Sequence, residues 1–461
     1  MSALFDYLNK TANPDLLFID ADTKESIRWN KLIVPFPFIE DAEKKLVFLY
    51  LDNSLVSVKI LLSFVKSKHL LCLLGNGLQE DLKKQLESIY LPDYIFDNAR
   101  NAIPGSTIVY EQNTFKLFYT KKSVRPLHED LKILLSTSGT TGSPKFVKLS
   151  DSNFINNTES IIDYLPIDHF DNTILNLPIH YSYGLSVLLT NIVRGGKIIC
   201  SNDTVLSRSF WNVFKEYAIN NLAGVPYTYE MLIRLGFLKM TDLQLKYMTQ
   251  AGGKLEEQTL LLFAEYTRQQ GAQFYVMYGQ TEATARMSYL PPDKLSDKTT
   301  SIGLPIKNGK FSIDPSNKEL MYTGPNVGSG YAQSVEDLEH CSPLAKLHTG
   351  DLAEVDIDGF YYITGRLKRF IKLFGNRISL DEIEQYLTKE YNGFIGCCGI
   401  QDKTLLIFSD KAEVMSDQVR NYVSDKYKTH ISAIKYVYLA VIPLTQNHKV
   451  NYQAVIRTYG G

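Results

Sequence analysis

The stretch KILLSTSGTTGSPKFVKLS, residues 132–150, combines residue types that could bind a polyphosphate. Gly139 and Gly142 would let main-chain N–H groups approach a phosphate without side-chain obstruction, and Lys145 adds a positive charge. The loop also carries five hydroxyl side chains that could donate hydrogen bonds: Ser136, Thr137, Ser138, Thr140 and Thr141. Pro144 stands where a Walker-type GxxxxGK[ST] motif has its second glycine, so the sequence disfavours that class of NTPase. The alternative is a flexible Ser/Gly turn without a ligand.

The strand that would present this loop belongs to an alternating pattern of strands and helices. The early chain predicts short buried strands and amphipathic helices: strands at 45–52, 69–75 and 93–97, and helices at 53–67 and 78–90. Such alternation is typical of βαβ units and a parallel sheet. Two later predicted strands run directly into glycine-containing loops, at 132–139 and 272–280. Because ligands collect where such strands end, both loops are candidate sites.

Towards the C-terminus the pattern changes to short antiparallel strands. Asp-Gly and Gly-Asn turns interrupt the apolar stretches at 352–365 and 370–378. A helix is predicted to begin at Ser379, with Glu382 completing a capping box three residues later. The composition of the chain marks no linker between the two patterns.

The composition excludes several classes of protein. A net charge of -1 over 461 residues provides no basic surface for DNA or RNA. No apolar run approaches the roughly 18 residues of a membrane helix, and residues 1–10 lack the features of a signal peptide. Five cysteines predict neither a disulfide framework nor a metal site, and adjacent Cys397 and Cys398 are expected to pack on opposite faces of a strand. The expected location is the cytoplasm.

Several motifs in a fixed order resemble those of one enzyme superfamily. TSGTTGSPK at 137–145 is similar to the phosphate loop of the AMP-forming adenylating enzymes: acyl-CoA and aryl-CoA synthetases, luciferases and peptide-synthetase adenylation domains. YGQTEAT at 278–284, the segment 347–384 and PLTQNHKVNY at 443–452 resemble the later motifs of that family. The form GRLKRFIK around Lys368 resembles the branch of 4-coumarate–CoA ligase and luciferase. The resemblance runs from about residue 45 to the end.

The resemblance implies an α/β fold in two domains. Residues 1–366 would form a large ATP- and acid-binding domain of helix-flanked sheets with a small β-barrel-like portion, and residues 367–461 a small, mobile α+β lid. It also implies that a carboxylic acid reacts with ATP and Mg²⁺ to give an acyl-adenylate and pyrophosphate. The acyl group would then pass to the thiol of CoA, or to the phosphopantetheine of a separate acyl carrier protein.

By the same resemblance, the nucleotide site has assigned residues. Lys145 and the loop would hold the β- and γ-phosphates, Thr281 the α-phosphate, and Glu282 the Mg²⁺, which prefers oxygen ligands. Asp351 would accept hydrogen bonds from the ribose hydroxyls, and Arg366 would donate one. The full ATP-binding set is Thr137, Ser138, Gly139, Thr140, Thr141, Gly142, Lys145, Ala251, Gly252, Gly253, Tyr278, Gly279, Gln280, Thr281, Asp351, Arg366 and Lys449. Tyr278 would offer a flat face for adenine, although it could also be a core aromatic.

The resemblance further implies two working positions of the lid. Lys368 would be the hinge, and Lys449 would bridge the carboxylate and the phosphate during adenylation. In the thiol step the loop from Lys372 to Gly375 would approach, with Gly375 leaving room for the pantetheine arm. The expected catalytic groups are therefore Lys449, Thr281, Glu282 and Lys372.

The acid itself is less closely defined. The expected pocket consists of Tyr181, Ser182, Tyr183, Val225, Pro226, Gly252 and Tyr278. Ser182 stands where amino-acid-activating relatives carry an aspartate that pairs with the substrate ammonium, so an α-amino acid is disfavoured. The other residues suggest a modest acyl, hydroxyacyl or aryl acid. We expect the neighbouring His180 to be a hydrogen-bonded structural residue.

Three departures from the family pattern leave alternatives open. Phe146 replaces an almost invariant glycine, Asp151 replaces the usual histidine, and no glycine precedes Lys449. Phe146 could redirect the chain that leaves the phosphate loop. The alternatives to an acid–thiol ligase are an enzyme that passes its adenylate to a non-thiol acceptor such as an amine, and a degenerate nucleotide-binding protein.

Overall fold

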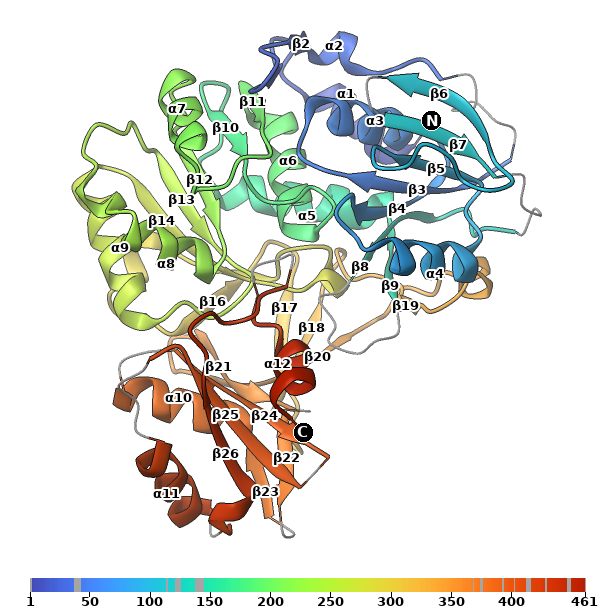
Figure 1. Ribbon diagram of the computed structural model, residues 1–461. Coiled ribbons are helices and arrows are strands. Elements are labelled where there is room, and N and C mark those ends of the chain that lie inside the picture. The colour runs from blue at the N-terminus through green and yellow to red at the C-terminus, as the bar shows by residue number, and fades with distance from the viewer. Residues whose placement is uncertain are drawn as a thin grey trace. The chain divides into compact units, whose positions relative to one another are not determined.

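The computed structural model describes most of the chain in two compact units (Figure 1). The described residues are 2–36, 43–112, 115–120, 126–136, 145–367, 369–373, 376–391, 394–401, 403–411, 416–427, 429–445 and 449–460. The first unit comprises Met1–Phe311 and Tyr322–Leu347, and the second comprises Ser312–Met321 and His348–Gly461.

An eight-stranded sheet is built on the predicted βαβ units of the first unit. Its strands, in spatial order, are β19 (Tyr331–Ala332), β9 (Phe146–Ser150), β8 (Leu131–Ser136), β4 (Leu70–Gly75), β3 (Leu46–Leu51), β5 (Tyr94–Asp97), β7 (Phe115–Tyr119) and β6 (Thr107–Gln112). β3 pairs in parallel with β4 and β5, and β4 pairs in parallel with β8. The predicted connecting helices are α3 (Leu55–Lys66), which begins after the N-cap Ser54, and α4 (Glu80–Tyr90). The sequence prediction for this region is confirmed.

A second sheet in the same unit is also mostly parallel. Its strands, in spatial order, are β16 (Ser301–Pro305), β15 (Ser288–Leu290), β14 (Gln273–Tyr278), β13 (Tyr247–Gln250), β12 (Asn221–Gly224), β10 (Asn172–Leu175), β11 (Lys197–Cys200), β1 (Leu17–Asp20) and β2 (Ser26–Arg28). The run from β14 to β1 is parallel, whereas β2, β15 and β16 pair antiparallel. β16 and β15 extend this sheet beyond β14, and a small β-barrel-like portion of this domain remains a prediction.

Helices fill the space between the two sheets and cover their outer faces (Figure 1). The helices of the first unit besides α3 and α4 are α1 (Ala3–Thr11), α2 (Trp29–Leu32), α5 (Asp151–Tyr164), α6 (Ser182–Arg194), α7 (Arg208–Glu216), α8 (Pro226–Arg234) and α9 (Glu257–Gln269). Side chains of α1, α3 and α6 share one buried cluster with strands from both sheets. Successive residues of β3 point to opposite faces, so Val47 and Leu49 join this cluster while Phe48 and Tyr50 pack with Tyr90 of α4.

The second unit is an α+β arrangement. Its strands are β18 (Glu319–Thr323), which ends just beyond the unit's limit, β20 (Leu347–Val355), β21 (Tyr361–Arg366), β22 (Phe370–Leu373), β23 (Asn376–Ser379), β24 (Ile395–Ile400), β25 (Thr404–Ser409) and β26 (Ile434–Tyr438), and β17 (Lys310–Ile313) crosses the division. Its helices are α10 (Leu380–Tyr391), α11 (Ser416–Tyr427) and α12 (Tyr452–Tyr459). The predicted hairpins β20–β21 and β22–β23 are antiparallel.

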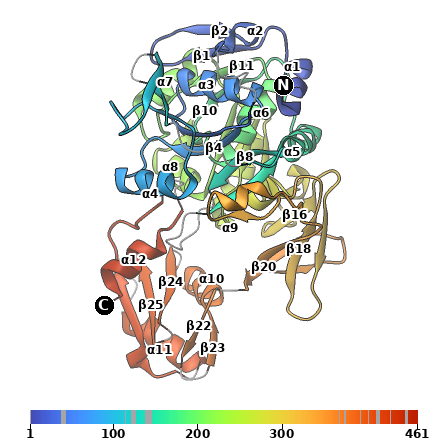
Figure 2. The same ribbon diagram turned by 90° about the vertical axis from the view of Figure 1, so that its right-hand side faces the viewer.

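A three-stranded sheet, β24–β25–β26, organises the core of the second unit. Cys397 faces the buried cluster of α10 and α11, whereas Cys398 faces the cluster that contains Val455 of α12, so helices lie on both faces (Figure 2). The opposite-face packing expected of the two cysteines is confirmed. The predicted cap of α10 is also present, because the Glu382 N–H donates to the Ser379 hydroxyl at 3.3 Å.

The two units divide earlier in the chain than the domains expected from the sequence. Compactness assigns β20 and β21 to the second unit, so the division falls between Leu347 and His348 rather than after residue 366. The expected hinge, Lys368, lies outside the described residues, and a hinge at that position remains a prediction. Within the described part of the chain, no helix is long and apolar enough to cross a membrane.

Candidate active site

The segment that follows β14 carries the residues expected to bind the α-phosphate and the metal. Thr281–Ala283 form one 3₁₀ turn, after which Thr284 adopts φ 67° and ψ −60°. Ala285 N–H donates to the Ala283 carbonyl at 2.8 Å, so Thr284 is the centre of a strained γ-turn. Gly279 is required on steric grounds, because a Cβ atom there would lie 1.9 Å from the Ala285 carbonyl oxygen.

Two asparagines fix this strained segment from outside. The Asn326 amide donates to the carbonyls of Ala283 and Arg286 at 2.9 Å, and the Thr284 hydroxyl donates to the Asn326 carbonyl at 2.7 Å. The Asn157 amide on α5 also donates to the Arg286 carbonyl at 2.9 Å. Strain persists only where surrounding contacts over-determine it, and these bonds supply such contacts.

Lys145 and Glu282 meet on either side of one tyrosine. The hydroxyl of Tyr331 donates to Glu282 Oε1 at 2.5 Å, and Lys145 Nζ lies 3.8 Å from the centroid of the Tyr331 ring. Antiparallel pairing of Tyr331 with Val147 places this ring next to the start of β9. The predicted phosphate-binding lysine and the predicted metal-binding carboxylate therefore lie at one place in the first unit.

The residues present fit a magnesium ion that is shared with phosphate. Mg²⁺ is usually held by one or two carboxylates together with substrate phosphates and waters. Glu282 Oε1 accepts the hydrogen bond from Tyr331, so the second carboxylate oxygen of Glu282 is the hard ligand that it could offer to Mg²⁺. The structure contains, within its described ranges, no group of three or more His, Cys, Asp or Glu residues arranged to hold a metal. The described residues therefore fit a site in which Mg²⁺ is held by one carboxylate, that of Glu282, together with substrate phosphates.

The start of α6 brings two expected acid-pocket residues towards this segment. The Ser182 and Thr281 hydroxyl oxygens lie 3.4 Å apart. Tyr183 is half-buried, and its hydroxyl contacts both the carbonyl and the hydroxyl oxygen of Thr249 on β13, at 3.0 and 2.9 Å. Tyr181 precedes the helix as its N-cap residue.

The expectation that His180 is a hydrogen-bonded structural residue is wrong. The side chain is buried and its ring lies 4.5 Å from that of Tyr181. Neither ring nitrogen has a hydrogen-bond partner among the residues that the structure describes. Burial lowers the pKa of His180 to about 4, so the ring is neutral at pH 7.

The small-residue segment Ala251–Gly253 packs closely against the start of α8. Ala251 is buried, and its N–H donates to the Gly224 carbonyl at 3.2 Å. A Cβ atom on Gly253 would lie 3.1 Å from Pro226, whereas Gly252 has a positive φ of 87°. Val225, buried, is the N-cap residue of α8.

Tyr278 and Gln280 lie on either side of Gly279 at the end of β14. The Tyr278 ring is half-buried, and its centroid lies 6.3 Å from that of Phe311. This placement is compatible with both readings of Tyr278, the adenine platform and the core aromatic. Gln280 is half-buried and is the N-cap residue of the 3₁₀ turn.

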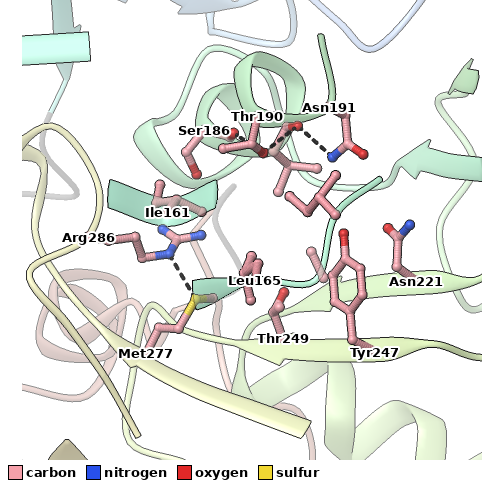
Figure 3. Close-up of a pocket in the computed structure, with 13 residues that line it drawn as sticks. Ile161, Leu165, Ser186, Thr190, Asn191, Asn221, Tyr247, Thr249, Met277 and Arg286 are labelled. Atoms are coloured by element: carbon pink, nitrogen blue, oxygen red, sulfur yellow. Dashed lines mark hydrogen bonds between the residues drawn. The ribbon is translucent and has the colours of Figure 1, made fainter. Parts of the chain in front are cut away.

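A small cavity of about 20 Å³ lies in the first unit. It is enclosed by α5, α6 and the strands β12 to β14, and Arg286 reaches into it with Thr249 and Tyr247 opposite (Figure 3). The guanidinium carbon of Arg286 lies 3.9 Å from the Tyr183 ring centroid, and its Nε contacts the Met277 sulfur at 3.3 Å. Arg286 is the residue of this region that sequence reasoning missed.

In the second unit, the two residues expected to bind ribose contact each other. Arg366 Nε lies 3.2 Å from Asp351 Oδ1 across the β20–β21 pair, in which the two residues are register partners. Asp351 is buried, whereas the side chain of Arg366 is exposed. The Asp381 carboxylate accepts from the Arg366 N–H at 2.7 Å, which fixes the strand backbone.

Lys449 is hydrogen-bonded to Thr445 in the second unit. Its N–H donates to the Thr445 hydroxyl at 3.2 Å, and its carbonyl accepts from the Thr445 N–H at 2.7 Å. The remaining expected site residues lie outside the described residues: Thr137, Ser138, Gly139, Thr140, Thr141, Gly142, Lys368, Gly375 and the side chain of Lys372.

The two substitutions that depart from the family pattern have structural roles. Phe146 pairs with Ser136 in the β8–β9 ladder and is buried, with its ring centroid 5.0 Å from that of Tyr90. The Asp151 carboxylate accepts from the Ser2 hydroxyl at 3.1 Å and from the Ala3 N–H at 3.0 Å. Asp151 therefore anchors the start of α1.

The comparison with protein families identifies the family of the chain. Residues 38–332 match the model of the AMP-binding enzyme family, and the chain belongs to that family.

Curated relatives include several CoA ligases. A 2-succinylbenzoate–CoA ligase of Staphylococcus aureus is 29% identical over 314 residues, which span 65% of this chain and 62% of the relative. An oxalate–CoA ligase of Arabidopsis thaliana is 29% identical over 272 residues, 56% of this chain and 52% of the relative. The chain therefore matches less than two thirds of the length of either protein.

Solved structures share the fold over nearly the whole chain. The o-succinylbenzoate CoA synthetase of Bacillus subtilis in complex with its acyl-adenylate intermediate has a TM-score of 0.75 at 18% identity, covering 99% of this chain and 98% of that one. The same enzyme with ATP and magnesium has a TM-score of 0.72 at 20% identity, covering 98% of both chains. The expected α/β fold with a large N-terminal and a small C-terminal domain is confirmed.

Proposed function

We propose that this chain is an AMP-forming acid–thiol ligase. It activates a small carboxylic acid with ATP and transfers the acyl group to the thiol of CoA. The observation that carries this proposal is the grouping of Lys145, Tyr331 and Glu282 beside the segment of Thr281. The relatives named for 2-succinylbenzoate and oxalate, two small acids, support the substrate class.

The first step joins two anions, and the proposed residues reduce their repulsion. A carboxylate oxygen attacks the α-phosphorus, and the bond to the bridging oxygen breaks to release pyrophosphate. Lys145 binds the β- and γ-phosphates, Thr281 donates to the α-phosphate, and Lys449 neutralises charge between the carboxylate and the phosphate. Glu282 would hold Mg²⁺, which neutralises phosphate charge when bound.

The second step breaks the mixed anhydride. The thiol sulfur attacks the acyl carbon, its proton is lost to solvent, and AMP leaves. We propose that the C-terminal part, residues 367–461, turns about Lys368 between the two steps, with Lys372 and Gly375 near the thiol in the second. Asp351 and Arg366 would hold the ribose. Such a reaction suits the cytoplasmic location that the composition predicts.

The test is acid-dependent ATP–pyrophosphate exchange over a panel of short, hydroxy, medium-chain and aromatic acids. Exchange with one class of acid, followed by acyl-CoA formation when CoA is added, is the expected result. Acyl transfer to a purified carrier protein or to an amine, but not to CoA, would instead identify one of those acceptors. No exchange with any acid, by a protein that still binds ATP, would favour the degenerate nucleotide-binding protein.

A further inference from the structure

Arg286 is a buried cation that lines the small cavity next to α5, α6 and β14. Only 4% of the residue is exposed. Its guanidinium lies among residues of α5, α6 and β14 (Figure 3). A buried charge is costly unless a counter-charge or several hydrogen bonds compensate it.

The surroundings of Arg286 supply little compensation. No carboxylate lies within ion-pair distance of the guanidinium in the part of the chain that the structure describes. Its side-chain contacts are the Met277 sulfur and the face of the Tyr183 ring. Burial raises the pKa values of Tyr183 and Tyr164, so neither phenol supplies a negative charge at pH 7. Arg100, also buried in this unit, contrasts with it, because Arg100 pairs with Glu87 at 2.6 Å.

The position of Arg286 is fixed before any ligand arrives. Its carbonyl accepts two hydrogen bonds, from Asn157 and Asn326, and its N–H donates to Asn157 Oδ1 at 3.3 Å. A side chain that is buried on an anchored backbone is preorganised for binding.

Arg286, which lines the cavity, also contacts Tyr183, a residue of the proposed acid site. Tyr183, whose ring lies under the guanidinium, follows Ser182, whose hydroxyl oxygen is 3.4 Å from that of Thr281. Arg286 itself lies four residues after Glu282 in the chain, just beyond the strained Thr284. Thr249 and Asn221 add polar side chains to a lining that also contains Ile161 and Leu165. An acid whose reacting carboxylate lies at Thr281 would direct its other end towards Arg286.

We propose that Arg286 binds a second carboxylate of the substrate, so that the enzyme prefers dicarboxylic acids. This inference rests on the proposed function and makes its substrate class more specific. The second carboxylate supplies the counter-charge that the protein itself does not place beside Arg286. An uncharged chain end would leave the largely buried guanidinium without a counter-charge, so the matching monocarboxylic acid is the poorer substrate.

The test is ATP–pyrophosphate exchange with pairs of acids that share a carbon skeleton: butyrate with succinate, valerate with glutarate, hexanoate with adipate, and benzoate with phthalate. The wild-type enzyme is expected to have the higher kcat/KM for the dicarboxylic member of at least one pair. Arg286→Met should lower kcat/KM for that acid by about 100-fold, the order expected for a truncated buried charge pair, and should spare the monocarboxylic partner. Arg268→Met, at an exposed site on α9, is the matched control and should preserve the preference.

Two results would overturn the inference without affecting the proposed function. One is exchange by the wild type that favours the monocarboxylic member of every pair. The other is an equal loss for both members of a pair in Arg286→Met, which would indicate a structural role. If Arg286→Met does not fold, Arg286→Lys decides, because the loss of the guanidinium fork should still reduce the dicarboxylate preference at least tenfold. Absence of exchange with all acids in the wild type would instead contradict the proposed function.

Discussion

Tyr331 donates a 2.5 Å hydrogen bond to Glu282 Oε1, and the same ring lies under the ammonium of Lys145. The tyrosine therefore positions both groups that are proposed to act on the phosphates and their metal. Burial and the neighbouring carboxylate both raise the pKa of Tyr331, so its hydroxyl keeps the proton that it donates at neutral pH.

Replacement of Tyr331 by phenylalanine should weaken the use of magnesium. Tyr331→Phe keeps the ring beneath Lys145 and removes only the bond to Glu282. Loss of a hydrogen bond to a metal ligand typically reduces metal affinity by about 10- to 100-fold. The Mg²⁺ concentration for half-maximal exchange should rise by that order, whereas the exposed Tyr438→Phe should leave it unchanged. An unchanged Mg²⁺ requirement in Tyr331→Phe would show that the bond does not position Glu282.

Replacement of Asp351 by asparagine should weaken ATP binding. The amide keeps the size of the buried side chain but loses the charge that faces Arg366 and, in the proposed function, the ribose. A charge-assisted hydrogen bond contributes about 1.5–3 kcal/mol, so the KM for ATP should rise by roughly 10- to 100-fold. Asp358→Asn, in the exposed turn between β20 and β21, is the control. Equal KM values for ATP in both variants would show that Asp351 does not contribute to nucleotide binding.

Phe146 should be essential for stability. Its side chain is 1% exposed and packs against Tyr90 and Phe48, so Phe146→Ala should lower the free energy of unfolding by about 3–5 kcal/mol. Phe170→Ala, at a site 75% exposed, should change it by less than about 0.5 kcal/mol. Urea unfolding measures both. A stable Phe146→Ala protein would mean that this core relaxes around the cavity.

His180 should make the folded state sensitive to acid. Burial lowers its pKa from 6.5 to about 4, so between these pH values the unfolded chain binds a proton that the folded chain does not. The free energy of unfolding should therefore fall as the pH is lowered through this range, by up to about 3 kcal/mol. His180→Phe should remove this part of the pH dependence and leave stability at pH 7.5 nearly unchanged. The same slope in both proteins, measured by urea unfolding at each pH, would assign it to other groups.

Local patterns were sufficient to predict most elements that position the site. The strands at 45–52, 69–75 and 93–97 and the helices between them formed as expected, because continuous apolar runs and helical periodicity are local signals. Tyr331 and Arg286 gave no such signal. Tyr331 reaches Glu282 through the pairing of β19 with the distant β9, and the burial of Arg286 depends on helices from another part of the chain.

The surroundings of individual residues also could not be predicted from local sequence patterns. The neighbours of Phe146 and His180 come from segments far away in the sequence, so neither the buried packing of the first nor the missing partners of the second could be derived from spacing. The motif resemblance named the site residues but not these contacts, because a motif records residue types and their order only.

The most direct test of the central claim is ATP–pyrophosphate exchange by the wild type, Lys449→Ala and Lys435→Ala. Lys435, whose ammonium donates to the Tyr459 carbonyl at 2.7 Å, is a structural lysine of the same unit. We predict acid-dependent exchange in the wild type and in Lys435→Ala, and a loss of at least 100-fold in Lys449→Ala, because in the proposed function the charge of Lys449 bridges the two reacting anions. Exchange that is absent from the wild type with every acid, or unchanged in Lys449→Ala, would contradict the account.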